Sequence, residues 1–219
     1  MSENLKENHP SIKSYVYRQG RLTTRQKNAL DRSDAHRFPA YVAKNPKGFS
    51  RPAVLEIGFG NGQSLVKQAS MNPNMDFIGI EIYPPGVGQA IAASQALELN
   101  NLFVFQGDLD AFLQASHMPK WTKIQIFFPD PWHKRRHHKR RLVTTDRLNQ
   151  LAQTLCVGGL MHVVTDWDDY ADFIHQSFAG AWRLKCASIL PTLKRETTKY
   201  EARAKRLGHR IHEFIYVKL

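Results

Sequence analysis

The segment Phe127–Arg141 reads FFPDPWHKRRHHKRR and combines an acid, a flat aromatic side chain and a run of positive charge. Asp130 stands between two prolines, which restrict the backbone of both neighbours, so its carboxylate is expected on a stiff extended turn. Trp132 adds an apolar face, and residues 134–141 hold six Lys or Arg and two His. These side chains together favour a site that holds one base of a polyanion.

The elements that position this segment alternate between strands and helices. Such alternation is typical of a parallel sheet covered by helices on both faces. The predicted strands are Ala53–Ile57, Phe77–Ile82, Leu102–Phe105, Ile124–Phe128 and Leu160–Thr165. The predicted helices follow them, up to Met71 and then over Pro84–Leu99, Asp110–Ser116, Thr145–Cys156 and Trp167–Phe178.

The C-terminal part has a different pattern. Trp182–Ala187 and Ile211–Val217 are predicted strands without a crossover helix, so we expect an antiparallel pair. The resulting α/β fold is a mostly parallel seven-stranded sheet with an antiparallel C-terminal hairpin, which resembles the Rossmann-like class I S-adenosylmethionine-dependent methyltransferases. Residues 1–35 are expected to form a basic, partly flexible extension with a helix near Thr24–Leu30, and residues 36–219 a single methyltransferase domain.

Composition and charge limit the classes of function. The chain has 219 residues, 42% of them hydrophobic, and no apolar run long enough to cross a membrane. Its two cysteines, Cys156 and Cys186, lack metal-site spacing, which favours a reduced cytoplasmic protein. The net charge of +12 divides into +7 over residues 1–51, −4 over 52–133 and +9 over 134–219. This distribution fits a small cationic ligand in the centre and a polyanion across the rim.

A glycine turn follows the first predicted strand. Gly58, Gly60 and Gly62 allow the backbone to approach a ligand closely at the carboxyl edge of the sheet. Gln63 stands where a dinucleotide-binding fingerprint has its third glycine. Glu56, just before the turn, would repel a pyrophosphate but attract a sulfonium or an ammonium group.

A second acid closes the second predicted strand, and a third follows the third predicted strand. Glu81 is placed to accept hydrogen bonds from both hydroxyls of a ribose, as in NAD and in S-adenosylmethionine sites. Asp108 could accept from an adenine amino group. Each acid alone could be a surface residue at a strand end. With Glu56, three successive strands end in an acid, and we identify the cofactor as S-adenosylmethionine.

The segment around Asp130 resembles the signature of the bacterial tRNA (guanine-N7)-methyltransferases, which methylate a guanine at position 46 in the variable loop of tRNA. Ser14–Leu30 and Thr197–His209 also resemble blocks of that family, so the resemblance covers nearly the whole chain. It implies that Asp130 is catalytic. It also implies a cofactor site made of Glu56, Gly58, Gly60, Glu81 and Asp108.

The resemblance also implies a set of substrate-binding residues. These are Lys134, Asp166, Thr198, Lys199, Tyr200 and Glu201. Without the family, Asp166 could equally cap the next helix, and the block that contains Tyr200 would be an ordinary charged helix. The chain departs from the family pattern at Glu196, which replaces a usual proline, at Tyr200, which replaces a phenylalanine, at Gly107-Asp108-Leu109 and at the C-terminal HEFIYVKL. These departures leave open a divergent paralogue of the family.

The chemistry of guanine N7 assigns an electrostatic role to Asp130. N7 already has a free lone pair, so no general base is required, but the purine becomes cationic as the bond forms. A carboxylate nearby would stabilise this charge. The basic residues Arg135, Arg136, Lys139, Arg140 and Arg141 are expected to bind tRNA phosphates. His133 and His137 lie four residues apart among cations without a nearby acid, so no metal site is predicted.

Two other functions remain open from the sequence. Asp130-Pro131-Trp132 partly matches the (Asn/Asp)-Pro-Pro-(Tyr/Phe) turn of enzymes that methylate an exocyclic amino group. A non-catalytic RNA-binding protein on a degenerate methyltransferase scaffold is the second, although the intact glycine turn and the three acids oppose it. The sequence also leaves open whether the protein is a monomer or a homodimer.

Overall fold

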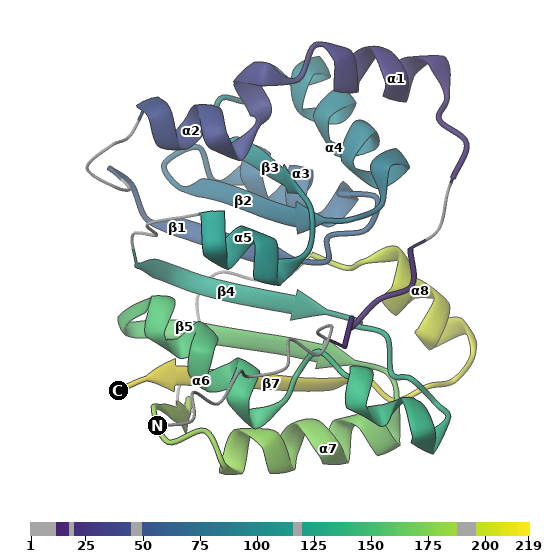
Figure 1. Ribbon diagram of the computed structural model, residues 1–219, viewed down its shortest axis with the longest axis vertical. Coiled ribbons are helices and arrows are strands. Elements are labelled where there is room, and N and C mark those ends of the chain that lie inside the picture. The colour runs from purple at the N-terminus through teal and green to yellow at the C-terminus, as the bar shows by residue number, and fades with distance from the viewer. Residues whose placement is uncertain (1–11, 18–19, 45–49, 116–119, 188–195) are drawn as a thin grey trace, which may run out of the picture.

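A computed structural model shows seven strands in one sheet, in the order β3-β2-β1-β4-β5-β7-β6 (Figure 1). The structure describes residues 12–17, 20–44, 50–115, 120–187 and 196–219. The strands are β1 (Ala53–Ile57), β2 (Asp76–Glu81), β3 (Leu102–Gln106), β4 (Trp121–Phe127), β5 (Leu155–Thr165), β6 (Leu184–Cys186) and β7 (His212–Lys218). β1 to β5 pair in parallel, whereas β7 runs antiparallel to both β5 and β6, which confirms the predicted fold class.

Helices pack on both faces of the sheet, each face around its own apolar cluster. One cluster joins α1, α3 and α4 to β2 and β3, and the other joins α2, α5, α6 and α7 to the central strands. The helices are α1 (Thr24–Asp31), α2 (Phe38–Lys44), α3 (Gln63–Met71), α4 (Pro84–Ala96), α5 (Leu109–Ala115), α6 (Thr145–Thr154), α7 (Asp168–Ala179) and α8 (Lys199–Arg206). Two short 3-10 helices, η1 (Asp34–His36) and η2 (Arg135–Arg140), complete the described elements. All five residues of β1 are buried, as expected of a central parallel strand.

Several predicted boundaries were wrong, among them the start of β4, which lies at Trp121 and not at Ile124. The helix predicted over Thr145–Cys156 ends at Thr154, and β5 begins at Leu155, five residues earlier than predicted. Trp121 pairs with Leu155 but Lys123 with Leu160, so β5 bulges at a Gly-Gly pair that resembles a turn in sequence. The predicted strand Trp182–Ala187 shortens to β6, because a turn bond from the Leu184 N–H to the Ala181 carbonyl occupies its start.

The start of the described chain packs on the same fold. Helix α1 begins at a capping box between Thr23 and Gln26, as its predicted position requires. Ala29 is buried in the apolar cluster of α3 and α4. A Cβ at Gly88 of α4 would lie 2.9 Å from the Gln26 carbonyl oxygen, so glycine permits this close approach. The division at residue 35 stays a prediction, and residues 1–11, 18–19 of the predicted extension lie outside the described residues.

Candidate functional site: an acid-lined cleft beside a basic loop

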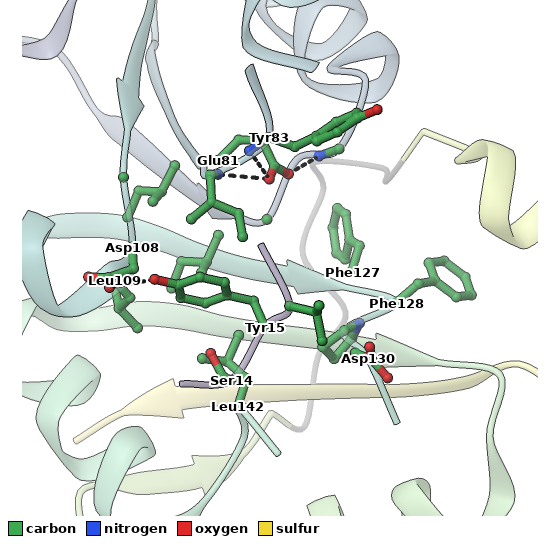
Figure 2. Close-up of a pocket in the computed structure, with 18 of the residues that line it drawn as sticks. Ser14, Tyr15, Glu81, Tyr83, Asp108, Leu109, Phe127, Phe128, Asp130 and Leu142 are labelled. Carbon is green, nitrogen blue, oxygen red and sulfur yellow. Dashed lines mark hydrogen bonds between the residues drawn. The ribbon is translucent and has the colours of Figure 1, made fainter. Parts of the chain in front are cut away.

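A cleft of about 480 Å³ opens at the carboxyl edge of the parallel strands. Figure 2 shows Glu81 and Asp108 on two sides of this cleft and Asp130 on a third. Its wall includes Gly58 and Gly60 of the glycine turn. Because parallel strands end at one edge, residues from four strand ends meet here, and the volume suits a ligand of cofactor size.

The glycine turn and Glu81 hold each other in place. Gly58, Gly60 and Gly62 have φ of 76°, 63° and 73°, a region that other residues rarely adopt. The Gly60 N–H donates to Oε2 of Glu81 at 2.8 Å. Oε1 of Glu81 accepts from the N–H groups of Ile82 and Tyr83 at 2.8 and 3.0 Å. These bonds fix both carboxylate oxygens at the cleft, although burial raises the pKa of Glu81.

Asp108 is held by the N-terminal segment, residues 12–17. Lys13 Nζ lies 2.7 Å from Oδ2 of Asp108, and the Tyr15 hydroxyl donates to the same oxygen at 2.9 Å. Oδ1 accepts from the Ala111 N–H. Burial opposes ionisation, but these hydrogen bonds lower the pKa of Asp108. Asp108 is therefore an ionised acceptor at the cleft.

The N-terminal segment also contacts the turn of Asp130. Nε1 of Trp132 donates to the Ser14 carbonyl at 3.3 Å, while Ser14 and Tyr15 line the cleft. The segment thus joins Asp108, through Tyr15, to Trp132, through Ser14. Figure 2 shows Tyr15 reaching toward Asp108. Sequence reasoning assigned no role to these residues. The resemblance of Ser14–Leu30 to a family block was the only signal that could have found them.

Glu56 lies below the glycine turn and lines a small adjoining cavity instead of the large cleft. Its side chain is 3% exposed and accepts a 2.7 Å hydrogen bond from Nε2 of Gln125. Burial raises the pKa of Glu56 to about 7, although Gln125 and the charge of Lys123 act in the opposite direction. A cation at the turn would therefore favour loss of the Glu56 proton near neutral pH.

The Asp130 turn has unusual backbone geometry on both sides. Phe128 and Trp132 each have φ of 51°, which is strained for residues with a side chain. Oδ1 of Asp130 accepts from the Trp132 N–H at 3.1 Å, and Asp130 is exposed at the mouth of the cleft. Strain of this kind persists only where surrounding contacts enforce it, and it concentrates at functional sites.

The basic loop, residues 134–141, forms η2 beside this turn. Lys134 stands at the N-cap position of η2 without a side-chain cap bond and is exposed, as are Arg135, Arg136 and Lys139. Arg140 lies over the ring of Trp132, 4.8 Å from its centroid. The expectation that Arg141 binds phosphate was wrong, because Arg141 is 4% exposed and ion-paired with Asp169. Its guanidinium faces the protein interior.

Of the predicted substrate residues Thr198, Lys199, Tyr200 and Glu201, Tyr200 alone lines the large cleft. Tyr200 lines both the cleft and the small cavity, and its ring is 6.4 Å from that of Phe128 between centroids. Thr198 caps α8 and lines the small cavity with Lys199. Glu201 is buried, with Oε1 2.7 Å from Nζ of Lys205.

Asp166 follows β5, the strand next to β4. Its Oδ2 lies 3.1 Å from Nδ1 of His209, which ties the end of β5 to the loop after α8. Neither Asp166 nor Lys134 is part of the wall of the large cleft. Sequence reasoning missed Tyr83, Phe128 and Leu142, which do line it.

The described part of the chain has neither a metal-binding cluster nor a membrane-spanning helix. No group of three or more His, Cys, Asp or Glu side chains there could hold a metal ion. No helix among those residues is long and apolar enough to cross a membrane.

Comparison with known proteins places the chain among methyltransferases. Residues 50–214 match the family model described as "Putative methyltransferase". Two solved structures share the fold. TrmN from Thermus thermophilus is 16% identical, with a TM-score of 0.55 over 89% of this chain and 52% of that chain. An rRNA methylase from Streptococcus thermophilus is 12% identical, with a TM-score of 0.53 over 77% of this chain and 87% of that chain.

Curated relatives give a narrower result. The tRNA (guanine-N(7)-)-methyltransferase of Nitrosococcus oceani is 42% identical over 90% of this chain and 87% of its own length. Those of Alkalilimnicola ehrlichii and Pseudoalteromonas atlantica are 38% and 36% identical, over 94% and 95% of this chain and 92% of each relative. This chain belongs to the tRNA (guanine-N7)-methyltransferase family.

Proposed function

We propose that the protein transfers a methyl group from S-adenosylmethionine to N7 of a guanine in tRNA, and that this guanine is at position 46 of the variable loop. The observation that carries the proposal is the position of Asp130, whose strained turn borders the same cleft as Glu81 and Asp108. The names of the relatives support the reaction.

The residues of the cleft suit S-adenosylmethionine. Glu81 has two fixed carboxylate oxygens with acceptor capacity for the ribose hydroxyls. Asp108 would accept a hydrogen bond from the adenine amino group. Lys13 and Tyr15, which now contact Oδ2 of Asp108, would then move away or share this oxygen with the adenine. Gly58 and Gly60 have no side chain and so leave room for the cofactor beside the turn. Glu56, buried behind the glycine turn, would balance the positive charge of the cofactor.

When bound, this cofactor supplies a methyl group on a positively charged sulfur. Guanine N7 forms the new bond with its own lone pair as the carbon–sulfur bond breaks and its electron pair stays on sulfur. The products are a cationic 7-methylguanine and a neutral thioether, and no proton moves. The protein must therefore orient the base and stabilise its new charge.

Asp130 is the residue placed for this task. As an exposed carboxylate at the mouth of the cleft, it could accept from the guanine N1–H and amino group and stabilise the developing cation. Tyr200 would stack on the base, and Lys134, Asp166 and the start of α8 would contact the surrounding nucleotides. The exposed cations of the basic loop would bind tRNA phosphates.

Methyl transfer from labelled S-adenosylmethionine tests the proposed function. The substrates are unmodified tRNA with guanine at position 46 and the same tRNA with adenine there. We expect label on the guanine tRNA only, and strand scission at that base after reduction and aniline treatment. Label without scission would indicate amino-group methylation instead. Tight tRNA binding without label would indicate a non-catalytic RNA-binding protein.

A further inference from the structure

The turn that presents Asp130 needs an external support. Phe128 and Trp132 both have φ of 51°, and the bond from the Trp132 N–H to Asp130 lies within the turn itself. Strained backbone relaxes unless packed neighbours hold it. Residues outside the turn must therefore hold it in position.

Arg141 is such a group. Its Nε donates to the Pro131 carbonyl at 3.1 Å, the carbonyl directly after Asp130. Its Nη2 donates to Oδ2 of Asp169, in the first turn of α7, and lies 3.2 Å from Nε2 of His138. One planar guanidinium thus joins the Asp130 turn to a helix on the face of the sheet.

Two aromatic rings of α7 also pack against this guanidinium. The Arg141 guanidinium carbon lies 4.9 Å from the ring centroid of Tyr170 and 5.0 Å from that of Phe173. The Tyr170 hydroxyl in turn accepts from the Val143 N–H at 3.1 Å. Stacked, paired and hydrogen-bonded, Arg141 has little freedom to move.

The neighbouring arginine shows the alternative arrangement. Arg140 lies over Trp132 on the outside of the loop, where its charge can reach a phosphate. The charge of Arg141 is compensated by Asp169, whose pKa is lowered by the hydrogen bond from Arg141. Two adjacent arginines of one basic run therefore have different partners.

We propose that Arg141, held by Asp169, is a positioning residue that fixes the Asp130 turn through the Pro131 carbonyl. The inference rests on the proposed function, because the proposed function places Asp130 at the target base. Arg141 does not touch the substrate in this assignment and contributes no phosphate contact.

Two conservative variants test the assignment. Arg141→Lys keeps the charge but loses the planar fork, and Asp169→Asn keeps the shape but loses the ion pair. We expect both to lower kcat by about 10- to 100-fold, the scale of a small misplacement of reacting groups. Affinities for tRNA and S-adenosylmethionine should change by less than about twofold. Arg183→Lys, beside the distant strand β6, is the matched control and should leave kcat unchanged.

A double-mutant cycle with Asp130→Asn separates positioning from general loosening. If Arg141 acts through Asp130, then Arg141→Lys should lower kcat by less than about twofold further in the Asp130→Asn background. Losses that multiply would overturn the proposal. A weaker tRNA affinity with a flatter salt dependence and an unchanged kcat would also overturn it, because that is the signature of a phosphate contact.

Hydrogen exchange of the apo protein supplies a readout that does not need the reaction. Amides of the 128–134 turn should exchange faster in Arg141→Lys and Asp169→Asn than in wild type or Arg183→Lys, while β1 and β4 keep their protection. Unchanged exchange in the turn would overturn the positioning role. If wild type makes no 7-methylguanine but the turn loosens as expected, the proposed function fails and the structural anchor stands.

Discussion

The cleft and the basic loop hold their charged side chains in different ways. In the cleft, Glu81 and Asp108 are partly buried and hydrogen-bonded to backbone N–H groups. In the loop, Arg135 and Arg136 are exposed at the rim. Fixed acids give directional contacts to one small ligand, whereas exposed cations give a field that salt weakens. Asp130 lies between the two regions, so chemistry should depend on the first and affinity for tRNA on the second.

The largest expected effect tests Asp130 itself. Asp130→Asn keeps the size of the side chain but removes the charge that would stabilise the cationic base. We expect kcat to fall by about 100- to 1,000-fold, as for other groups that stabilise transition-state charge, with tRNA affinity nearly unchanged. Steady-state methylation and filter binding measure the two quantities. Asp146→Asn, exposed in α6, is the control, and full activity of Asp130→Asn would remove Asp130 from the mechanism.

The next effect belongs to the cleft alone. Glu81→Gln keeps one acceptor oxygen but loses the charge-assisted bonds expected to the ribose hydroxyls. We expect affinity for S-adenosylmethionine to fall by about 10- to 100-fold, with tRNA affinity unchanged. Calorimetric titration of apo protein checks this, with the exposed Glu98→Gln as control. Equal losses for both ligands would show that the two regions are not separable.

The pH dependence sharpens the contrast, because Glu56 titrates near neutrality. Its pKa is raised to about 7, so the carboxyl is protonated in the free protein below that pH and must ionise to attract the cofactor cation. Affinity for S-adenosylmethionine should therefore weaken by up to about tenfold per pH unit below that pKa. Glu56→Gln should flatten this profile. An equally steep profile in that variant would exclude Glu56 as its source.

The same shift has the opposite sign for stability. Folding binds a proton at Glu56 between the unfolded and folded pKa values, so its contribution to the free energy of unfolding declines as pH rises from 4.5 to about 7. Above that range the buried carboxylate is ionised, and the stabilising contribution is lost. Denaturant unfolding of wild type and Glu56→Gln across this range measures the difference.

The smallest effect belongs to the loop. Arg140→Ala should weaken tRNA binding a few-fold and lower the magnitude of its salt slope by about one, while kcat at saturating tRNA changes little. Lys185→Ala, on the edge strand β6, controls for net charge. An unchanged slope for Arg140→Ala would mean that this side of the loop does not contact the phosphate backbone.

The sequence predicted the cleft better than the loop, for a physical reason. Glu81 ends one parallel strand and Asp108 follows another, and parallel strands bring their carboxyl ends to one edge, so their meeting follows from topology. Arg141 could not be distinguished from Arg140, because nothing in a basic run shows which side chain turns toward Asp169. The contact between Tyr15 and Asp108 joins residues 93 positions apart and follows from no local pattern. Likewise, the bulge at the start of β5 depends on pairing with β4.

Replacement of one atom in the substrate tests the central claim most directly. A tRNA with 7-deazaguanine at position 46 lacks the N7 lone pair but keeps the Watson–Crick edge that Asp130 would contact. We predict binding within about twofold of normal tRNA and no methyl transfer under single-turnover conditions, since each remaining contact is preserved. Methylation of this tRNA at the normal rate would contradict N7 as the acceptor and the role given to Asp130.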